Sequence, residues 1–220
     1  MSRQLSNTNA LPFPVSCWET VRTVLRPYTQ ADENAFLDLW GDPVVQRLSF
    51  IEVLSPKETG EFLRRTLESV ARGELFLVVV EDKERREFLG QVSLNLKPPP
   101  ERDGVVGIAL KGRYRGRGFG TELMHWLITY GFRELGLRRI SLTVMEGNIP
   151  ALRMYKKMQV LNVPEIGRCT NLEADSGFID EGRTGGGTRS DGQSGVFICM
   201  GIEREEWDIQ RGRKREFRVS

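Results

Sequence analysis

The chain has 220 residues, of which 39% are hydrophobic and 28% are charged, as is typical of one globular domain with a substantial core. Its 32 Lys and Arg residues nearly balance 30 Asp and Glu residues, so the net charge of +2 gives no reason to expect DNA as a specific ligand. Scattered cysteines, a single histidine and no apolar run near the roughly 20 residues of a membrane span predict a cytoplasmic protein without a metal site or a membrane segment.

The N-terminal part of the chain predicts a short strand and three helices. Residues 1–16 are polar and aperiodic, so we expect a disordered lead-in followed by one domain over 17–207. Alternation over Val21–Pro27 indicates a strand. Capping residues followed by apolar residues at helical spacing then mark three helix starts. The predicted helices run from Thr29 to Gly41, from Pro43 to Ser49 and from Pro56 to Arg72.

The second part of the domain combines strands with two further helices. A charged turn separates Leu75–Val80 from Phe88–Leu96 and predicts a hairpin, and Val105–Leu110 is a third apolar run. The helix Gly118–Leu135 carries apolar residues round most of its circumference, which is typical of a helix buried against a sheet. This order of elements predicts an α/β (α+β) fold with a mixed sheet. The last predicted strand and helix are Arg139–Met145 and Asn148–Met158.

A glycine-rich loop joins the third apolar strand to the long helix. It carries three alternate glycines and three arginines, namely Gly116, Gly118, Gly120, Arg113, Arg115 and Arg117. Glycines let a phosphate group approach the backbone at the start of a helix, and the arginines add positive charge. The chain has no Gly-Lys-Ser/Thr of a P-loop, and Thr121 stands where a dinucleotide-binding fingerprint requires glycine. The loop therefore predicts a phosphate site of another kind.

Two motifs resemble those of the GNAT superfamily of N-acetyltransferases. The pattern [QR]xxGx[GA] is matched by Arg115, Gly118 and Gly120. The pattern NxxAxx[LM]YxK is matched by Asn148, Ala151, Met154, Tyr155 and Lys157, and the Gly-Phe pair that closes it is displaced to Gly177 and Phe178. The resemblance extends over about Trp18 to Trp207 and includes the ribosomal-protein alanine acetyltransferase (RimJ/RimL-like) branch. It implies a mixed, mostly antiparallel sheet of about seven strands flanked by helices.

The resemblance also implies a binding site for acetyl-CoA where the strands Val105–Leu110 and Arg139–Met145 diverge. The pantetheine arm would pair with the backbone of the first strand, and the pyrophosphate would lie on the glycine-rich loop. The cofactor-binding residues expected on this basis are Ile108, Ala109, Leu110, Arg115, Gly116, Arg117, Gly118, Phe119, Gly120, Thr121 and Asn148.

Catalytic residues follow from the same resemblance, in which an amine attacks the thioester directly. Tyr155 is the candidate acid for the departing thiolate, and Asn148 is expected to order the cofactor arm or the loop. Related enzymes often carry a glutamate base five residues before this asparagine, where the chain has Thr143. Glu146 is one candidate base, and a water chain ending on a backbone carbonyl is the alternative.

Residues 159–176 interrupt the second motif, because the resembled pattern passes from the helix directly into the next strand. We interpret the segment either as a surface insertion near the active site or as a translated intron, whose excision would restore the sequence Tyr-Lys-Lys-Met-Gly-Phe. The tail 208–220 is basic and is a candidate for contact with the ribosome.

The predicted function is transfer of an acetyl group from acetyl-CoA to a primary amine, with a protein N-terminus as the expected acceptor. A small amine such as a polyamine or an aminoglycoside-like compound is the alternative within the same class. A non-catalytic acyl-CoA-binding module is the alternative from another class, because Thr143 stands at the usual position of the base.

Overall fold

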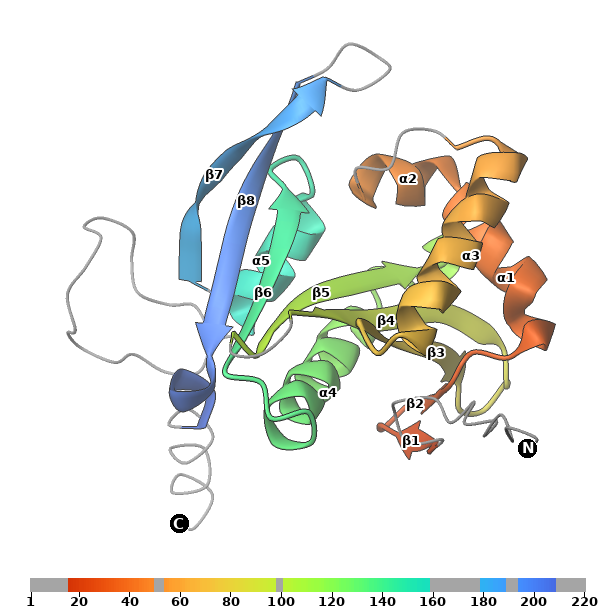
Figure 1. Cartoon of the computed structure of the whole chain (residues 1–220), viewed down its shortest axis with the longest axis horizontal. Coiled ribbons are helices and arrows are strands. Elements are labelled where there is room, and N and C mark those ends of the chain that lie inside the picture. Colours follow the sequence, from red (N-terminus) through yellow and green to blue (C-terminus); the bar gives the residue numbers. More distant parts are fainter. Residues whose placement is uncertain (1–15, 50–53, 98–100, 159–178, 189–193, 209–220) are drawn as a thin grey trace, which may run out of the picture.

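The computed structural model describes residues 16–49, 54–97, 101–158, 179–188 and 194–208 (Figure 1). Most of the predicted lead-in, the segment 159–176, the Gly-Phe pair that follows it and the tail after residue 208 lie outside these ranges. The disordered lead-in, the insertion and the ribosome contact therefore stay predictions. Within the described ranges no helix is long and apolar enough to cross a membrane.

The predicted helices and strands are present with small differences in their bounds. The capping box of Ser55 and Glu58, for example, begins the third helix as expected. The helices are α1 (Glu33–Gly41), α2 (Pro43–Ser49), α3 (Pro56–Ala71), α4 (Phe119–Arg133) and α5 (Ile149–Lys157). The strands are β1 (Trp18–Glu19), β2 (Thr23–Arg26), β3 (Leu75–Asp82), β4 (Phe88–Leu96), β5 (Asp103–Leu110), β6 (Arg139–Met145), β7 (Ile179–Thr188) and β8 (Ser194–Glu203).

The described strands form one sheet in the order β1-β2-β3-β4-β5-β6-β8-β7. Among the described strands only β5 and β6 are parallel neighbours, so the predicted mixed and mostly antiparallel sheet is confirmed. The sheet has 8 strands, and the two-residue strand β1 at its edge accounts for the difference from the expected number. Such a short strand carries no periodicity that a sequence pattern could reveal.

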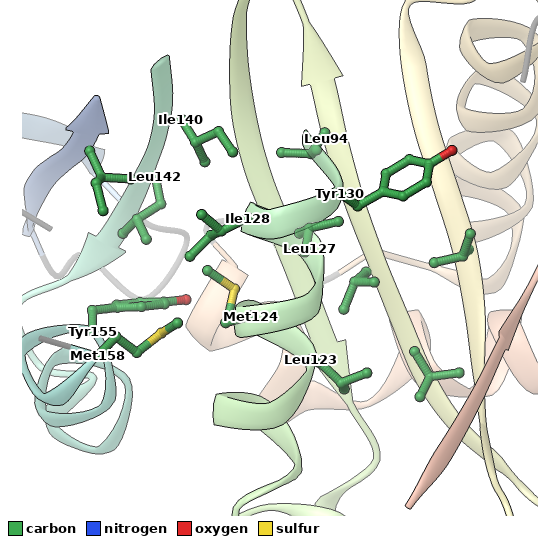
Figure 2. Close-up of a cluster of buried hydrophobic side chains, with 14 of the residues drawn as sticks. Leu94, Leu123, Met124, Leu127, Ile128, Tyr130, Ile140, Leu142, Tyr155 and Met158 are labelled. Carbon is green, nitrogen blue, oxygen red and sulfur yellow. The ribbon is translucent and has the colours of Figure 1, made fainter. Parts of the chain in front are cut away.

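The helices cover both faces of the sheet. Helices α4 and α5 pack on one face, where Leu127 of α4 lies near Leu94 of β4 and Tyr155 of α5 belongs to the same cluster (Figure 2). Helices α1 and α3 pack on the other face, against alternate residues of β3 that include Leu75. This confirms the prediction that α4 is buried, and it leaves β4 covered on both faces.

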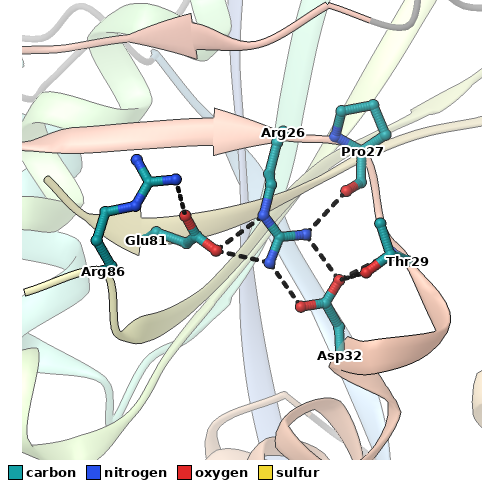
Figure 3. A network of polar contacts seen from close by, with 6 residues as sticks. All are labelled: Arg26, Pro27, Thr29, Asp32, Glu81 and Arg86. Carbon is teal, nitrogen blue, oxygen red and sulfur yellow. Dashed lines mark hydrogen bonds and ion pairs between the residues drawn. The ribbon is translucent and has the colours of Figure 1, made fainter.

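A buried ion-pair network fixes the start of α1 (Figure 3). Arg26 of β2 contacts both carboxylate oxygens of Asp32 at 2.7 Å and donates a hydrogen bond of 2.8 Å from Nε to Glu81 of β3. Burial alone would raise the pKa of Asp32, but hydrogen bonds from Arg26 and Thr29 lower it below its ordinary value. The network thus ties two strands to the turn that precedes α1.

Gly90 stands at an irregular point of β4, beside the register shift between Val80 and Glu81. Its φ is 155°, and a Cβ atom there would lie 2.1 Å from the carbonyl oxygen of Ala109 on β5. We expect Gly90→Ala to destabilise the protein by about 3 kcal/mol in urea unfolding, because the clash is with backbone that cannot rotate away.

Gly60→Ala is the matched control for this prediction. A Cβ atom on Gly60 of α3 would meet nothing within 4 Å, so that substitution is expected to be neutral or to stabilise the helix by up to about 1 kcal/mol. Equal unfolding midpoints for the two variants would contradict the role given to Gly90.

Candidate active site

A cleft of about 740 Å³ opens where β5 and β6 separate. The two strands pair only from Asp103–Arg139 to Val105–Ser141, and beyond this point they diverge (Figure 1). The predicted opening between these strands is therefore present in the structure. The cleft continues across the sheet face that carries α1, α2 and α3, so it has one part along β5 and α5 and another beneath the N-terminal helices.

The glycine-rich loop borders the part of the cleft along β5. Gly116 and Gly118 have φ values of 71° and 82°, which other residues adopt at a cost. Gly118 caps α4, and the backbone amide of Glu122 is the first to bond back into the helix, to the Gly118 carbonyl at 3.2 Å. The amides of the turn before it carry the partial positive charge of a helix N-terminus, as a phosphate group requires.

The arginines of the loop have different partners. Arg113 pairs with Glu87 at 3.0 Å and is not among the residues that line the cleft, so its contact with a phosphate stays a prediction. Arg115 lines the cleft, but its Nε donates to the Leu110 carbonyl at 2.9 Å and its Nη2 lies 3.5 Å from Asp42. Arg115 therefore also links the loop to the start of α2.

An ion pair holds the loop from the edge of the sheet. Arg22 donates from Nη1 to the Arg117 carbonyl at 2.8 Å, and its guanidinium lies 4.2 Å from the ring centre of Phe119. Glu122 in turn accepts from Nε of Arg22 at 2.7 Å and from the hydroxyl of Thr20. Although burial raises the pKa of Glu122, these hydrogen bonds lower it below its ordinary value, so the carboxylate stays charged.

Most of the residues predicted to bind the cofactor line this cleft. Two predicted members do not, because the side chain of Phe119 is buried in the core and Arg117 contributes a carbonyl to Arg22. The members that line the cleft are Ile108, Ala109, Leu110, Arg115, Gly116, Gly118, Gly120, Thr121 and Asn148.

The two candidate catalytic residues of the second motif also reach the cleft. Tyr155 of α5 lines it and is only 6% exposed, and burial raises the pKa of its hydroxyl to about 12. Its phenol is therefore protonated throughout the neutral range. Asn148 caps α5 by accepting a hydrogen bond of 3.3 Å from the backbone amide of Ala151. Its position at the cleft fits the ordering role expected for it.

The two sequence positions considered for a general base, 143 and 146, have different surroundings in the structure. Both residues are exposed, but Thr143 lies between buried neighbours on β6 and lines the cleft, whereas Glu146 lies in the turn after β6 and is not among the described lining residues. No carboxylate lines the cleft within the described part of the chain, and no group of His, Cys, Asp and Glu there could hold a metal ion. The charged side chains of the described lining are all cationic, namely Arg115, Arg153 and Lys157.

One set of lining residues was missed by the sequence prediction. Gln91, Ser93 and Asn95 of β4 alternate with apolar residues and face the part of the cleft beneath α1 and α3. Gln91 and Ser93 are buried, although the same alternation is also typical of a solvated strand face. The sequence signal that could have identified these lining residues was the alternation itself, together with the helices predicted nearby.

Comparisons with known proteins agree on the family. Residues 22–160 match the family model described as Acetyltransferase (GNAT) domain. An uncharacterized N-acetyltransferase p20 of Bacillus licheniformis is 26% identical over 143 residues, which cover 63% of this chain and 79% of that protein.

Solved structures share the fold. Spermidine N-acetyltransferase from Vibrio cholerae, in complex with CoA and spermine, has a TM-score of 0.69 at 20% identity over 84% of this chain and 97% of that chain. Ribosomal-protein-S5-alanine acetyltransferase from Vibrio fischeri has a TM-score of 0.64 at 18% identity over 87% of this chain and 98% of that chain. At these identities the likeness shows the fold and leaves the acceptor open.

Proposed function

Because the chain belongs to the GNAT acetyltransferase family, we propose that it transfers the acetyl group of acetyl-CoA to the N-terminal amine of a protein. The family membership makes it an N-acetyltransferase. The acceptor is the proposed part, and the charge of the cleft supports it.

The absence of carboxylates from the described lining is the observation that carries this proposal. An aliphatic amine such as that of a polyamine has a pKa of about 10.4, so about one amine group in a thousand is neutral at pH 7.4. The α-amine of a protein has a pKa of about 7.7 to 8.0, and a substantial fraction is already neutral. The cationic and neutral polar lining of the described residues suits the second amine, because these residues offer neither a carboxylate for a polycation nor a strong base.

The residues present fit acetyl-CoA as the acetyl donor, whose thioester supplies an activated carbonyl carbon when it is bound. The α4 N-terminus and the loop from Arg115 to Thr121 would hold its diphosphate. The backbone of Ile108 and Ala109, beyond the last β5–β6 pair, would hold the pantetheine arm as a strand does.

In the reaction a C–N bond forms to the attacking amine and the C–S bond breaks. Tyr155 stays protonated at neutral pH and donates a hydrogen bond where negative charge develops on sulfur. The amine loses one proton, which a water chain can carry to solvent, since no carboxylate lines the described cleft. Thr143 supplies a hydroxyl on the lining of β6 that could order such a water.

The proposal is tested by release of CoA thiol from acetyl-CoA across a panel of acceptors. The panel contains peptides with a free N-terminus, the same peptides with a blocked N-terminus, spermidine and an aminoglycoside. Release is expected with the free peptides alone. Release only with small amines would contradict the proposed acceptor, and CoA binding without release would favour the non-catalytic module.

Arg22→Ala is expected to raise the KM for acetyl-CoA about tenfold. The substitution removes the hydrogen bond to the Arg117 carbonyl and the contact with Phe119, and both hold the phosphate loop. The KM for the acceptor should not change. Arg133→Ala removes a positive charge from the other end of α4 and is the control. If both variants raise the KM for acetyl-CoA equally, net charge and not loop geometry is responsible.

A further inference from the structure

Two buried glutamines differ in the hydrogen bonds that their side chains make. Gln46 donates from Nε2 to the Trp40 carbonyl at 2.7 Å and accepts from the Leu54 amide at 3.1 Å, so both ends are bonded. Gln91 is 4% exposed, and its Oε1 atom has no hydrogen-bond partner among the described residues. Buried polar atoms nearly always have a partner, and one that lacks it in a cleft is available to a ligand.

The strand fixes the direction in which Gln91 points. Its neighbour Val92 belongs to the apolar cluster beneath α4, so Gln91 lies on the opposite face and lines the cleft. Across the β4–β5 pair, Gln91 stands opposite Ala109 and Ser93 stands opposite Gly107. A Cβ atom on Gly107 would lie 2.5 Å from the Ser93 hydroxyl oxygen, so any larger residue would crowd this floor. Small residues on β5 thus leave space beside the polar groups of β4.

The walls above this floor are apolar. Trp40 of α1 and Phe62 of α3 lie with their ring centres 4.8 Å apart, and Val45 and Leu48 of α2 line the cleft with them. The Nε1 atom of Trp40 is a second buried polar atom of the lining without a partner in the described chain. An apolar pocket with an unused acceptor and an unused donor matches the first residue of a peptide, which carries an amine, a carbonyl and a side chain.

We propose that this part of the cleft binds the first residue of the acceptor peptide, with Gln91 Oε1 accepting a hydrogen bond from its α-amine. The inference rests on the proposed function and names the subsite for that acceptor. Binding through an N–H leaves the lone pair of the neutral amine free for attack on the thioester. A neutral amide also does not stabilise the ammonium form, as a carboxylate at this position would.

Gln91→Met tests the subsite, because it keeps the side-chain length and removes the acceptor atom. It is expected to lower kcat/KM for a free N-terminal peptide about tenfold, through KM for the peptide, and to leave the KM for acetyl-CoA unchanged. Gln30→Met makes the same change at an exposed position before α1 that is not among the residues lining the cleft, and it is expected to alter neither constant. Unchanged peptide kinetics in Gln91→Met, or an equal rise in the KM for acetyl-CoA, would overturn the proposal.

Gln91→Glu provides a second readout if the methionine variant does not fold. A carboxylate in this place is expected to shift the ratio of kcat/KM values at least tenfold toward spermidine and away from the peptide. An unchanged ratio counts against the subsite. Failure of the proposed function gives a different result, because the wild-type protein would then acetylate spermidine and not the peptide. In that case the effect of Gln91→Met on the KM for spermidine would still test the role of Gln91.

Discussion

Tyr155→Phe is expected to lower kcat about 100-fold and to change the KM for acetyl-CoA by less than about twofold. Tyr155 lines the cleft, and with a pKa of about 12 its hydroxyl is protonated and able to donate a hydrogen bond to the departing sulfur. Phenylalanine keeps the ring that packs against the core near Met124 (Figure 2). The loss should therefore fall on the chemical step, and steady-state kinetics with an N-terminal peptide measures it.

Tyr130→Phe is the control for this variant. Tyr130 is also a buried tyrosine, on α4, and it is not among the residues that line the cleft. Its variant should retain wild-type kcat. If Tyr155→Phe also retains wild-type kcat, then Tyr155 is a core aromatic residue and the departing thiolate is protonated by another group.

Arg26→Met is expected to destabilise the protein by about 3 to 5 kcal/mol at pH 7, measured by urea unfolding. The side chains of Asp32 and Glu81 are 7% and 11% exposed, and without Arg26 two carboxylates would share a buried site without the cation that joins them (Figure 3). Activity should fall with stability, because this network positions α1, which contributes Trp40 to the cleft.

The pH dependence of stability distinguishes loss of the Arg26 ion pairs from a simple loss of packing. The pKa of Asp32 is lowered in the folded protein, so its stabilising contribution is present above the unfolded pKa of about 3.9 and is lost as pH falls through the folded value. The difference between wild type and Arg26→Met should therefore shrink as the pH falls toward about 4 and below. Arg64→Met removes two exposed ion pairs of α3, with Glu61 and Glu68, and should cost at most about 0.5 kcal/mol. A pH-independent difference would contradict the ionic role.

Local sequence signals predicted most of the fold. The capping box at Ser55, the charged turn between β3 and β4 and the continuous apolar surface of α4 are each encoded within a few residues. The pairing of β6 with β8 could not be predicted in this way, because residues 159–176 lie between these two strands in the chain. Only the tertiary structure shows how the sheet continues past that segment.

The sequence predicted the candidate site only where the backbone itself, and not contacts between distant side chains, forms it. The glycines of the loop predict a candidate phosphate site, since positive φ and a helix start are properties of the local chain. The partner of Arg113 was not predictable, because Glu87 lies in the turn between β3 and β4, far from Arg113 in the sequence. Gln91 was missed because a buried polar strand face and an exposed one share the same alternation, and only the covering helices distinguish them.

The most direct test of the central claim is the position of the acetyl group on a peptide that carries both a free α-amine and a lysine. The peptide is incubated with the protein and acetyl-CoA, and the product is located by tandem mass spectrometry. We predict acetylation of the α-nitrogen with the lysine unmodified, because the described cleft offers neither a carboxylate to bind an ammonium group nor a strong base to deprotonate it. Acetylation of the lysine nitrogen, with the α-amine left free, would contradict the account.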